Sequence, residues 1–443
     1  MKKRISFFFI LFSFGLSLFA QTVHDADLGE VKVHLSRKAA QISTPMNTED
    51  LELVTWVDDD FTSTTTGWGV THFNNIADAL LATADNGTVN VAAGTYVGDL
   101  TVSRPVTILG PNASINPNTG TRVAEAILIP STSAPDPNAT NATTMLYMTC
   151  SGVVLKGLTF DGNNPALTSG LLIDAVDVDA CEAIASYEGV GAITIQNNIV
   201  KNINYCAIDL YNYTNNAATK DNFIQNNLIQ NLSQISWGIG ILIYNNFYAV
   251  ISENVITKAR VGIQTGNYHR AIPAGGQARI ENNTLSVYRR GIFYNLHYSD
   301  ASPFSIKNNI ITIANGTPTN DGILVSSQGG TVSADFDNNT IRNAVVGVNY
   351  WNCTTTGDIT LKGGTIENCT YGLRVDNYDG YGPSNGGSTI AKISGTTIIN
   401  SGIAAIISKD NELNTNSATV RAEILPGTIF TNNPVDIMII NQD

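Results

Sequence analysis

A corner motif that recurs every 25 to 32 residues constrains the fold of this chain more than any other feature. Each copy has a short alternating apolar run, then an Asn pair or two small residues, then apolar positions. The copies are ITIQNNIV at 193, DNFIQNNLI at 221, VISENVI at 250, ARIENNTL at 278, FSIKNNII at 304, ADFDNNTI at 334, ITLKGGTI at 359 and AKISGTTI at 391. The equivalent residues Asn198, Asn227, Asn254, Asn283, Asn309 and Asn339 are 29, 27, 29, 26 and 30 residues apart, and Gly364 follows after 25. A period of this length predicts a solenoid, in which each coil buries its apolar face against its neighbours.

The residue types at the corner have a physical role. Asn tolerates the left-handed backbone that a sharp corner needs, and identical amides stacked in register can hydrogen-bond along the axis as a ladder. A second strand then starts at Gly262, Gly291, Gly347 and Gly372, eight residues after each corner residue. At Gly240 and Gly322 the spacing is 13, which predicts a five-residue loop insertion at one corner.

Alternation along this second strand separates its side chains into two rows. The inward row is predicted to be an aliphatic stack of Ile208, Ile241, Ile263, Ile292, Ile323, Val348 and Leu373. The outward row at the next position is Asp209, Leu242, Gln264, Phe293, Leu324, Asn349 and Arg374.

These repeats resemble those of the pectin-lyase-like right-handed parallel β-helix superfamily, over about residues 55–443. The resemblance implies an all-β solenoid of about 10 to 12 coils, with a capping segment at 55–110 and an insertion at 161–190. WVDDDF at 56, the run from 73 to 102 and PVTILGPN at 105 are similar to the first segment of surface β-helix proteins in that group. Asn74 or Asn75 can N-cap a short helix whose Ile76, Ala79 and Leu80 share one face, and this helix would close the open end of the first coil.

The N-terminus predicts export. MKKR followed by ISFFFILFSFGLSLFA has the layout of a secretory signal peptide, assigned to 1–20, and the polar stretch 21–54 is interpreted as a linker. No other segment is predicted to span a membrane, so a secreted or cell-surface location is expected. The net charge is −13, and removing Lys2, Lys3 and Arg4 with the signal gives −16. This charge excludes nucleic acid as a favoured partner and disfavours polyuronates unless local positive charge or a cation intervenes.

A lateral aromatic stripe is the leading candidate for a binding surface, because flat rings cover sugar faces while polar neighbours meet the hydroxyls. Its proposed polysaccharide-binding residues are Tyr211, Tyr244, Tyr248, Tyr268, Tyr298, Trp351 and Tyr378. The alternative is that some rings stack on one another or point inward, as alternation predicts for Tyr294 and Tyr350.

A polysaccharide lyase is the competing hypothesis. Lyases of the resembled superfamily use a basic side chain to remove a proton beside a uronate carboxylate, with calcium or cationic residues neutralising the acid, so Ca is a possible cofactor. The candidate catalytic residues are His269, Arg270, Arg289, Arg290 and His297, the one basic concentration in the chain; solvated loop charge is the alternative. A rigid stalk or adhesin without catalysis is the third hypothesis.

Other chemistry has weaker support. The NTD, paired-Asp and GHG motifs typical of the superfamily's hydrolases are missing, and Asp209 and Asp376 are six coils apart, although Asp376 and Asp379 are close in sequence. Asp58, Asp59 and Asp60 favour a turn or a cation-binding role. Among five cysteines a Cys353–Cys369 bridge is possible, as is a pairing among Cys150, Cys181 and Cys206; buried thiols are the alternative.

Overall fold

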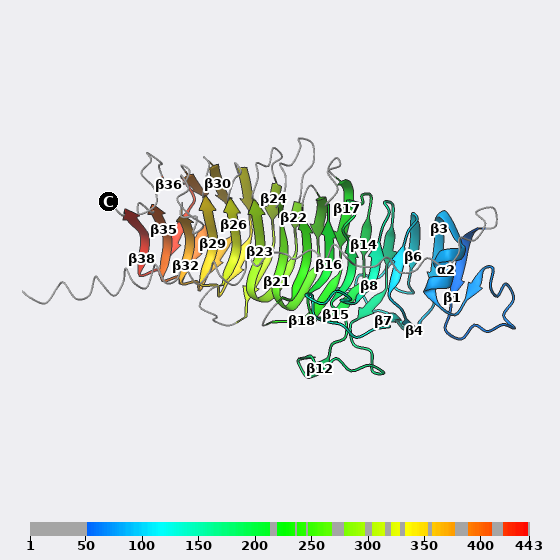
Figure 1. Cartoon of the computed structure of the whole chain (residues 1–443). Helices are drawn as coiled ribbons and strands as arrows, with labels where there is room; N and C mark the ends of the chain where they lie inside the picture. Colours follow the sequence, from blue (N-terminus) through cyan, green and yellow to red (C-terminus); the bar gives the residue numbers. More distant parts are fainter. Residues whose placement is uncertain are drawn as a thin grey trace, which may run out of the picture.

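The chain winds into a right-handed parallel β-helix (Figure 1). The computed structural model describes residues 51–212, 219–234, 237–244, 247–267, 279–296, 304–314, 320–327, 333–352, 357–376, 389–409 and 420–441. The predicted signal peptide and nearly all of the predicted linker lie outside these residues. Between neighbouring coils the strands of the described residues pair in parallel, so the fold expected from the repeat is confirmed.

Each coil contributes up to three strands, which stack into three faces. The first face is a 14-stranded sheet. Its strands are β2 (His72–Phe73), β1 (Glu52–Val57), β3 (Thr83–Val91), β6 (Val106–Leu109), β9 (Val154–Lys156), β14 (Thr194–Gln196), β17 (Thr219–Gln225), β20 (Phe247–Ser252), β22 (Arg279–Glu281), β24 (Phe304–Lys307), β27 (Ser333–Asp337), β30 (Gly357–Lys362), β33 (Thr389–Ser394) and β36 (Val420–Ile424). Leaving out the two-residue β2, the described chain makes about 13 coils, close to the 10 to 12 predicted.

The second face follows the Asn corner. It consists of β4 (Gly94–Val97), β7 (Ala126–Ile129), β10 (Thr159–Asp161), β15 (Ile199–Ile203), β18 (Leu228–Leu232), the first half of β21 (Val255–Asn267), the first half of β23 (Thr284–Leu296), β25 (Ile310–Ile313), β28 (Thr340–Arg342), β31 (Thr365–Glu367), β34 (Thr397–Ile399) and β37 (Ile429–Thr431).

The third face comes next along each coil. It consists of β5 (Leu100–Val102), β8 (Thr144–Met148), β13 (Glu182–Ser186), β16 (Cys206–Tyr211), β19 (Ile239–Tyr244), the second halves of β21 and β23, β26 (Asp321–Ser327), β29 (Val346–Asn352), β32 (Tyr371–Asp376), β35 (Ile403–Lys409) and β38 (Val435–Asn441). At Gly262 and Gly291, where the corner-to-Gly spacing is eight, β21 and β23 run unbroken from the second to the third face. At Gly347 and Gly372 the spacing is also eight, but separate strands flank the corner. Where the spacing is 13, two separate strands are joined by a longer connection, as the sequence predicts.

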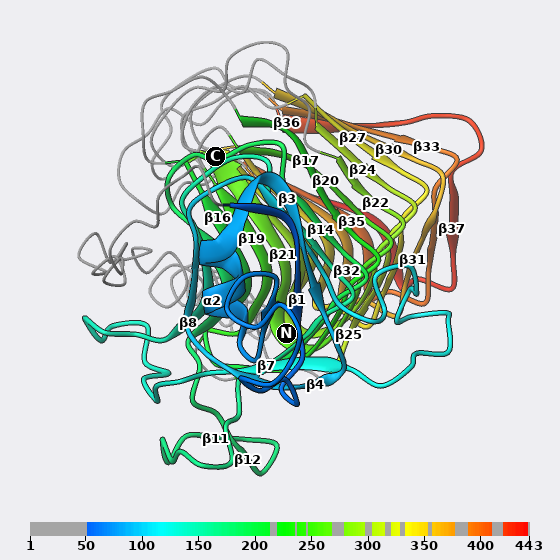
Figure 2. The same ribbon diagram turned by 90° about the vertical axis from the view of Figure 1, so that its right-hand side faces the viewer.

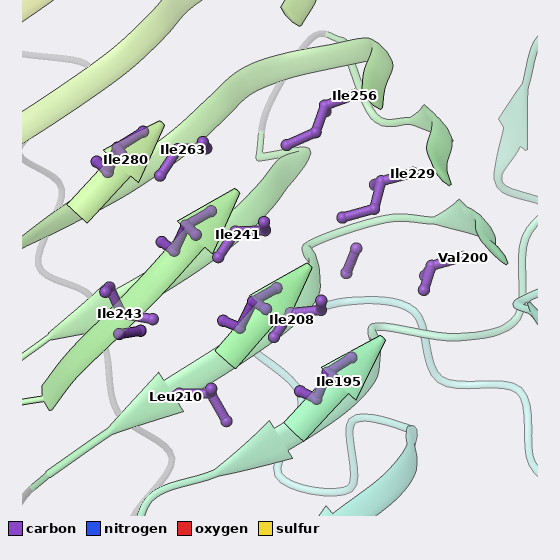
Figure 3. Close-up of a cluster of buried hydrophobic side chains, with 14 of the residues drawn as sticks. Ile195, Val200, Ile208, Leu210, Ile229, Ile241, Ile243, Ile256, Ile263 and Ile280 are labelled. Atoms are coloured by element: carbon purple, nitrogen blue, oxygen red, sulfur yellow. The ribbon is translucent and has the colours of Figure 1, made fainter. Parts of the chain in front are cut away.

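The inward row of the third face is the aliphatic stack that alternation predicts. Ile208 is in register with Ile241, Ile241 with Ile263, and the row continues to Leu373. The seven predicted members are all at most 1 % exposed. Figure 3 shows Ile208, Ile241 and Ile263 beside Ile195 and Ile280 of the first face and Ile229 of the second. Tyr294 and Tyr350 also point into this core, as predicted.

The Asn corner divides its two tasks between two residues. The first residue of each pair takes the left-handed backbone, for example Asn226 at φ 56° and Glu253 at φ 58°. The second residue is fully buried and forms the ladder, with Asn227 Nδ2 donating to Asn254 Oδ1 at 2.9 Å and the backbone N–H of Asn227 donating to the same oxygen at 3.0 Å. Glu253 occupies the first position in one coil with the same backbone conformation. The first position therefore requires the left-handed backbone and not an Asn side chain.

The N-terminal end of the solenoid is closed by the helix α2 (Ile76–Ala82), which Figure 2 shows in front of the coils. Asn75 is its N-cap, and its Oδ1 accepts from the backbone N–H of Asp78 at 2.8 Å. Ile76, Ala79 and Leu80 are buried against the first coil. The predicted capping helix is therefore present. No helix in the described residues is long and apolar enough to cross a bilayer.

Candidate functional site

The outer surface of the third face carries polar side chains that change from coil to coil. One column, at the position before the strand's Gly, contains Ile239, Val261, Arg290, Asp321, Val346 and Tyr371 in register. The next outward column is Asp209, Leu242, Gln264, Phe293, Leu324, Asn349 and Arg374. The sequence predicted that this second column points outward, and it does, but all except the half-buried Arg374 are at most 8 % exposed.

An ionic network lies at the centre of this surface. Arg290 Nε is 3.4 Å from Asp321 Oδ2, and both side chains are at most 7 % exposed. Asn349 Nδ2 donates to Asp321 Oδ1 at 2.9 Å. The Arg290 guanidinium also lies 4.8 Å from the centre of the Phe293 ring. Burial raises the pKa of Asp321, an effect that Arg290, Asn349 and Arg374 oppose.

Sequence reasoning proposed Arg290 but missed its acid partner. Asp321 is 31 residues further along the chain, so only the coil register brings the two together. A signal was available, because Arg290 directly precedes Gly291 and Asp321 directly precedes Gly322. Residues before equivalent glycines fall in one column of a solenoid.

A second polar cluster lies nearer the N-terminal end of the same surface. Glu182 is fully buried, and its two carboxylate oxygens accept from Thr144 Oγ1 at 2.8 Å and from the Tyr187 hydroxyl at 2.6 Å. Asp209 is 1 % exposed. Burial, with Asp209 and Glu182 nearby, raises the pKa of the Cys206 thiol well above its usual value. Cys206 is therefore a protonated, weakly nucleophilic thiol in this cluster.

Aromatic rings form a column beside these polar groups. Tyr147, Tyr187, Tyr211 and Tyr244 follow one another with centroid distances of 5.6, 6.0 and 5.5 Å. Tyr244 also accepts from Gln264 Nε2 through its hydroxyl at 2.8 Å. Tyr205 contacts Trp237 edge to face at 5.5 Å. Within this column Tyr147 and Tyr187 are half-buried, as is Trp237 beside it, so these three present part of their rings outward.

The structure corrects the predicted aromatic platform at three positions. Tyr211 and Tyr244 are 3 % and 2 % exposed, because their rings stack on each other and pack with Cys206, Leu242 and Val261. Tyr248 is 5 % exposed and belongs to β20 of the first face rather than to this surface. These three rings do not form an open platform; the alternative, stacking along the solenoid, describes Tyr211 and Tyr244.

Most of the other predicted site residues lie outside the described residues. This holds for Tyr268, Tyr298, Tyr378, His269, Arg270 and His297, and for the side chain of Trp351, whose backbone is part of β29. Arg289 is half-buried beside Arg290 on β23. The convergence of the basic cluster stays a prediction.

Two chain excursions flank this surface at the corner between the second and third faces. The segments 130–143 and 162–181 are joined through buried Asp179, whose carboxylate accepts from Ser133 Oγ at 2.5 Å and from the Asn164 N–H at 2.9 Å. The second excursion carries the hairpin β11 (Leu172–Ile173) and β12 (Val176–Asp177), which projects from the coils in Figure 1. At its tip Asp174 Oδ2 accepts from Lys258 Nζ at 2.8 Å. The predicted insertion 161–190 thus includes this excursion and also β13, a regular strand of the third face.

The remaining predictions concern acids and thiols. The ligand atoms of Asp58, Asp59 and Asp60 lie within 4.8 Å of one another. Asp58 Oδ1 accepts from the Asp60 N–H at 3.0 Å and Asp59 Oδ2 from the Thr95 N–H at 3.1 Å, so these groups have a turn role, and a calcium ion stays a prediction. None of the four described cysteines, Cys369 included, is in a disulfide. A Cys353–Cys369 bridge is therefore not formed, and Cys353 lies outside the described residues.

Comparison with known proteins finds distant structural similarity. No protein family matches the sequence, and no curated protein does so either. Among solved structures, the family 28 exopolygalacturonase of Yersinia enterocolitica is similar at 13 % identity, covering 86 % of this chain and 76 % of that one, with a TM-score of 0.46. The catalytic unit of the GH87 α-1,3-glucanase of Streptomyces thermodiastaticus has 12 % identity, 90 % and 70 % coverage and a TM-score of 0.43. The surface protein and adhesin PfbA of Streptococcus pneumoniae has 16 % identity, 82 % and 94 % coverage and a TM-score of 0.32.

Proposed function

We propose that this protein is exported and binds a polysaccharide on the outer surface of the third face. The observation that carries the proposal is the coil-to-coil variation of buried polar groups there, with Asp209, Gln264, Arg290, Asp321 and Asn349 on successive or nearby coils. A buried ion pair is weak support for stability, because removing charges from water costs about as much as their attraction returns. Such groups are better explained by recognition.

The chemistry of this surface suits a glycan. Tyr147, Tyr187 and Trp237 offer half-exposed aromatic rings, and sugar rings have apolar faces that pack on aromatic carbon. The half-buried Arg374 of the outward column can donate to hydroxyls. Asp209, Gln264, Arg290, Asp321 and Asn349 are at most 8 % exposed, so a glycan would have to uncover them to meet them. The excursions 130–143 and 162–181 lie at the corner between the second and third faces. They would limit the directions in which a glycan chain can cross the coils. The export part of the proposal rests on the sequence of residues 1–20.

Catalysis is not part of the proposal. Glycoside cleavage by paired carboxylates needs acids about 5 to 9.5 Å apart. Asp209 and Asp321 are separated by four coil steps, β16 to β19, β21, β23 and β26, which is about 19 Å at about 4.8 Å per strand. Glu182 and Asp209 lie on the neighbouring strands β13 and β16, but they are 0 % and 1 % exposed, and the Glu182 carboxylate already accepts from Thr144 and Tyr187. Arg290 is paired with the Asp321 carboxylate, with Nε 3.4 Å from Oδ2, and both side chains are buried.

The test is retention of the mature chain on a panel of immobilised neutral and acidic polysaccharides, with and without calcium. Trp237→Ala and Tyr187→Ala are expected to weaken binding to the retained glycan about tenfold each, the effect of losing about 1.4 kcal/mol of ring contact. Phe223→Ala is the matched control, because Phe223 is a 36 % exposed aromatic residue on β17 of the first face.

Three results would contradict the proposal. They are failure to retain any glycan, equal weakening by Phe223→Ala, and release of unsaturated or reducing ends from the glycan. The last result would favour the lyase or hydrolase hypothesis instead. Neither retention of a glycan nor release of ends would favour the stalk hypothesis.

A further inference from the structure

The residue type in the buried column of the Asn corner changes at Gly364. The next coil carries Thr396 at the same position. Earlier in the column each amide oxygen accepts twice; for example, the backbone N–H and Nδ2 of Asn309 both donate to Asn339 Oδ1 at 3.0 Å. Asn339 Nδ2 in turn donates to Ile306 O at 2.8 Å. Glycine has no side chain, so at residue 364 neither the oxygen nor the amide is provided.

Asn339 therefore has two polar hydrogens that the amide ladder does not use. They are its backbone N–H and the second hydrogen of Nδ2, and the described residues offer no acceptor to either. Asn339 is only 7 % exposed. Buried donors of this kind nearly always have a partner, which is either a protein group or an ordered water molecule.

A small cavity lies at this position inside the solenoid. Asn339, Gly363 and Thr396 line it on three successive coils, together with core side chains that include Ile341 and Ile366. Its volume is about 10 Å³, counted as the space that the centre of a water molecule can reach. A cavity of about 10 to 15 Å³ holds one water molecule. The cavity therefore has room for one water molecule and is too small for a sugar.

Thr396 adds a polar group from the coil beyond Gly364. Its side chain is 2 % exposed, and its Oγ1 has no hydrogen-bond partner within the described part of the chain. Thr428, the next residue of the column, differs because its Oγ1 donates to Ile393 O at 2.9 Å. A threonine at this corner can thus be paired within the protein, whereas Thr396 lines the cavity with its hydroxyl unpaired. Dry cavities in proteins are apolar, so polar groups from two coils favour a hydrated cavity.

We propose that one water molecule binds in this cavity and takes the place of the amide that Gly364 lacks. Its oxygen accepts from the backbone N–H and from Nδ2 of Asn339, as one Asn of the ladder accepts from another. Its two hydrogens donate to Thr396 Oγ1 and to the carbonyl oxygen of Phe336. Phe336 precedes its corner residue by three positions, as Ile306 does, and a carbonyl oxygen has two lone pairs. The water thus has four partners and carries the hydrogen bonding of the ladder across the glycine coil.

A crystal structure of the mature chain that resolves ordered water tests the site directly. The expected result is one peak of density at about 2.7 to 3.2 Å from both Asn339 Nδ2 and Thr396 Oγ1. The corner of Asn283 is the internal control, because Asn309 Oδ1 fills the equivalent place there and accepts from Asn283 Nδ2 at 3.0 Å. Density without a peak in the cavity, or a peak beyond hydrogen-bonding distance of either group, would overturn the proposal.

The sign of a stability change gives a second test. Thr396→Val replaces the hydroxyl by a methyl group of similar size. With water bound, the variant loses a hydrogen bond and its melting temperature should fall by about 1 to 3 °C, whereas removing an unpartnered hydroxyl would be neutral or stabilising. Thr397→Val is the matched control, because the half-buried Thr397 lies on the outside of β34 and its loss should not lower the melting temperature. A Thr396→Val chain that melts no lower than the native chain, or no lower than Thr397→Val, would contradict the bound water. Neither measurement depends on glycan binding.

Discussion

The Asn corner and the outer surface of the third face both bury polar side chains, but they arrange them differently. At the corner the same amide recurs, and five successive steps from Asn198 to Asn339 join Nδ2 to the next Oδ1 at 2.9 to 3.2 Å. On the outer surface an acid, an amide, an arginine and apolar residues replace one another in the same columns. Stacking favours repetition, so the variation on this surface agrees with the recognition role that we propose for it.

The largest expected effect comes from breaking the ladder. Asn254→Ala removes donors to Ile224 O and Asn283 Oδ1 and an oxygen that accepts twice from Asn227. Leaving these buried groups unsatisfied should lower the free energy of unfolding by about 4 kcal/mol, measured by urea denaturation. The control Asn308→Gly keeps the left-handed corner at φ 53° and should change stability by less than about 0.5 kcal/mol. Equal losses of unfolding free energy in the two variants would show that the ladder does not add to stability beyond the corner geometry.

A core truncation calibrates the ladder against apolar packing. Ile263→Ala in the fully buried inward row should cost about 3 kcal/mol through lost burial and the cavity that remains. Ile310→Ala, at a 44 % exposed outward position, should cost less than about 1 kcal/mol. Thermal or urea unfolding of both variants measures the difference; if Ile263→Ala exceeds Asn254→Ala, packing outweighs the ladder.

The ladder stops at Gly364, and this position provides a third comparison. Its φ is 74°, and an added Cβ would lie 2.2 Å from the carbonyl oxygen of Asn339. Gly170 has a similar φ of 79° but nothing within 4 Å of the same atom. Gly364→Ala should therefore destabilise by about 2 kcal/mol more than Gly170→Ala, because both carry the left-handed strain and only one carries the clash. Urea unfolding measures both variants, and similar unfolding midpoints for Gly364→Ala and Gly170→Ala would contradict the predicted clash.

The smallest expected effect concerns pH and the outer surface. Because burial raises the pKa of Asp321, the folded chain holds this proton more tightly than the unfolded chain does. Its contribution to stability is present at low pH and is lost as pH rises from the model-peptide value of 3.8 through the folded pKa. Asp321→Asn removes that loss, so the free energy of unfolding of the variant should rise relative to that of the native chain as pH rises. A difference in urea midpoint that stays constant with pH would contradict the assignment.

The sequence predicted the parts of this protein that repeat. The coil, the amide ladder, the inward row and the cap beneath Asn75 all follow from local spacing and residue chemistry. The burial of Tyr211 and Tyr244 did not follow, because alternation gives a side chain's direction but not what covers it. The Arg290–Asp321 pair was missed for a related reason: contacts between coils join residues about 30 positions apart.

The cap α2 also gives the chain a starting point. Each coil pairs only with the coils before and after it, so the order of coils along the sequence is their order in space. A polypeptide that emerges N-terminus first can close its first coil under α2 and then add each new coil to a finished one. Folding can thus keep pace with delivery of the chain, and the newest coil always has an unpaired edge, until the last coil, where nothing further in the described chain arrives to cover it.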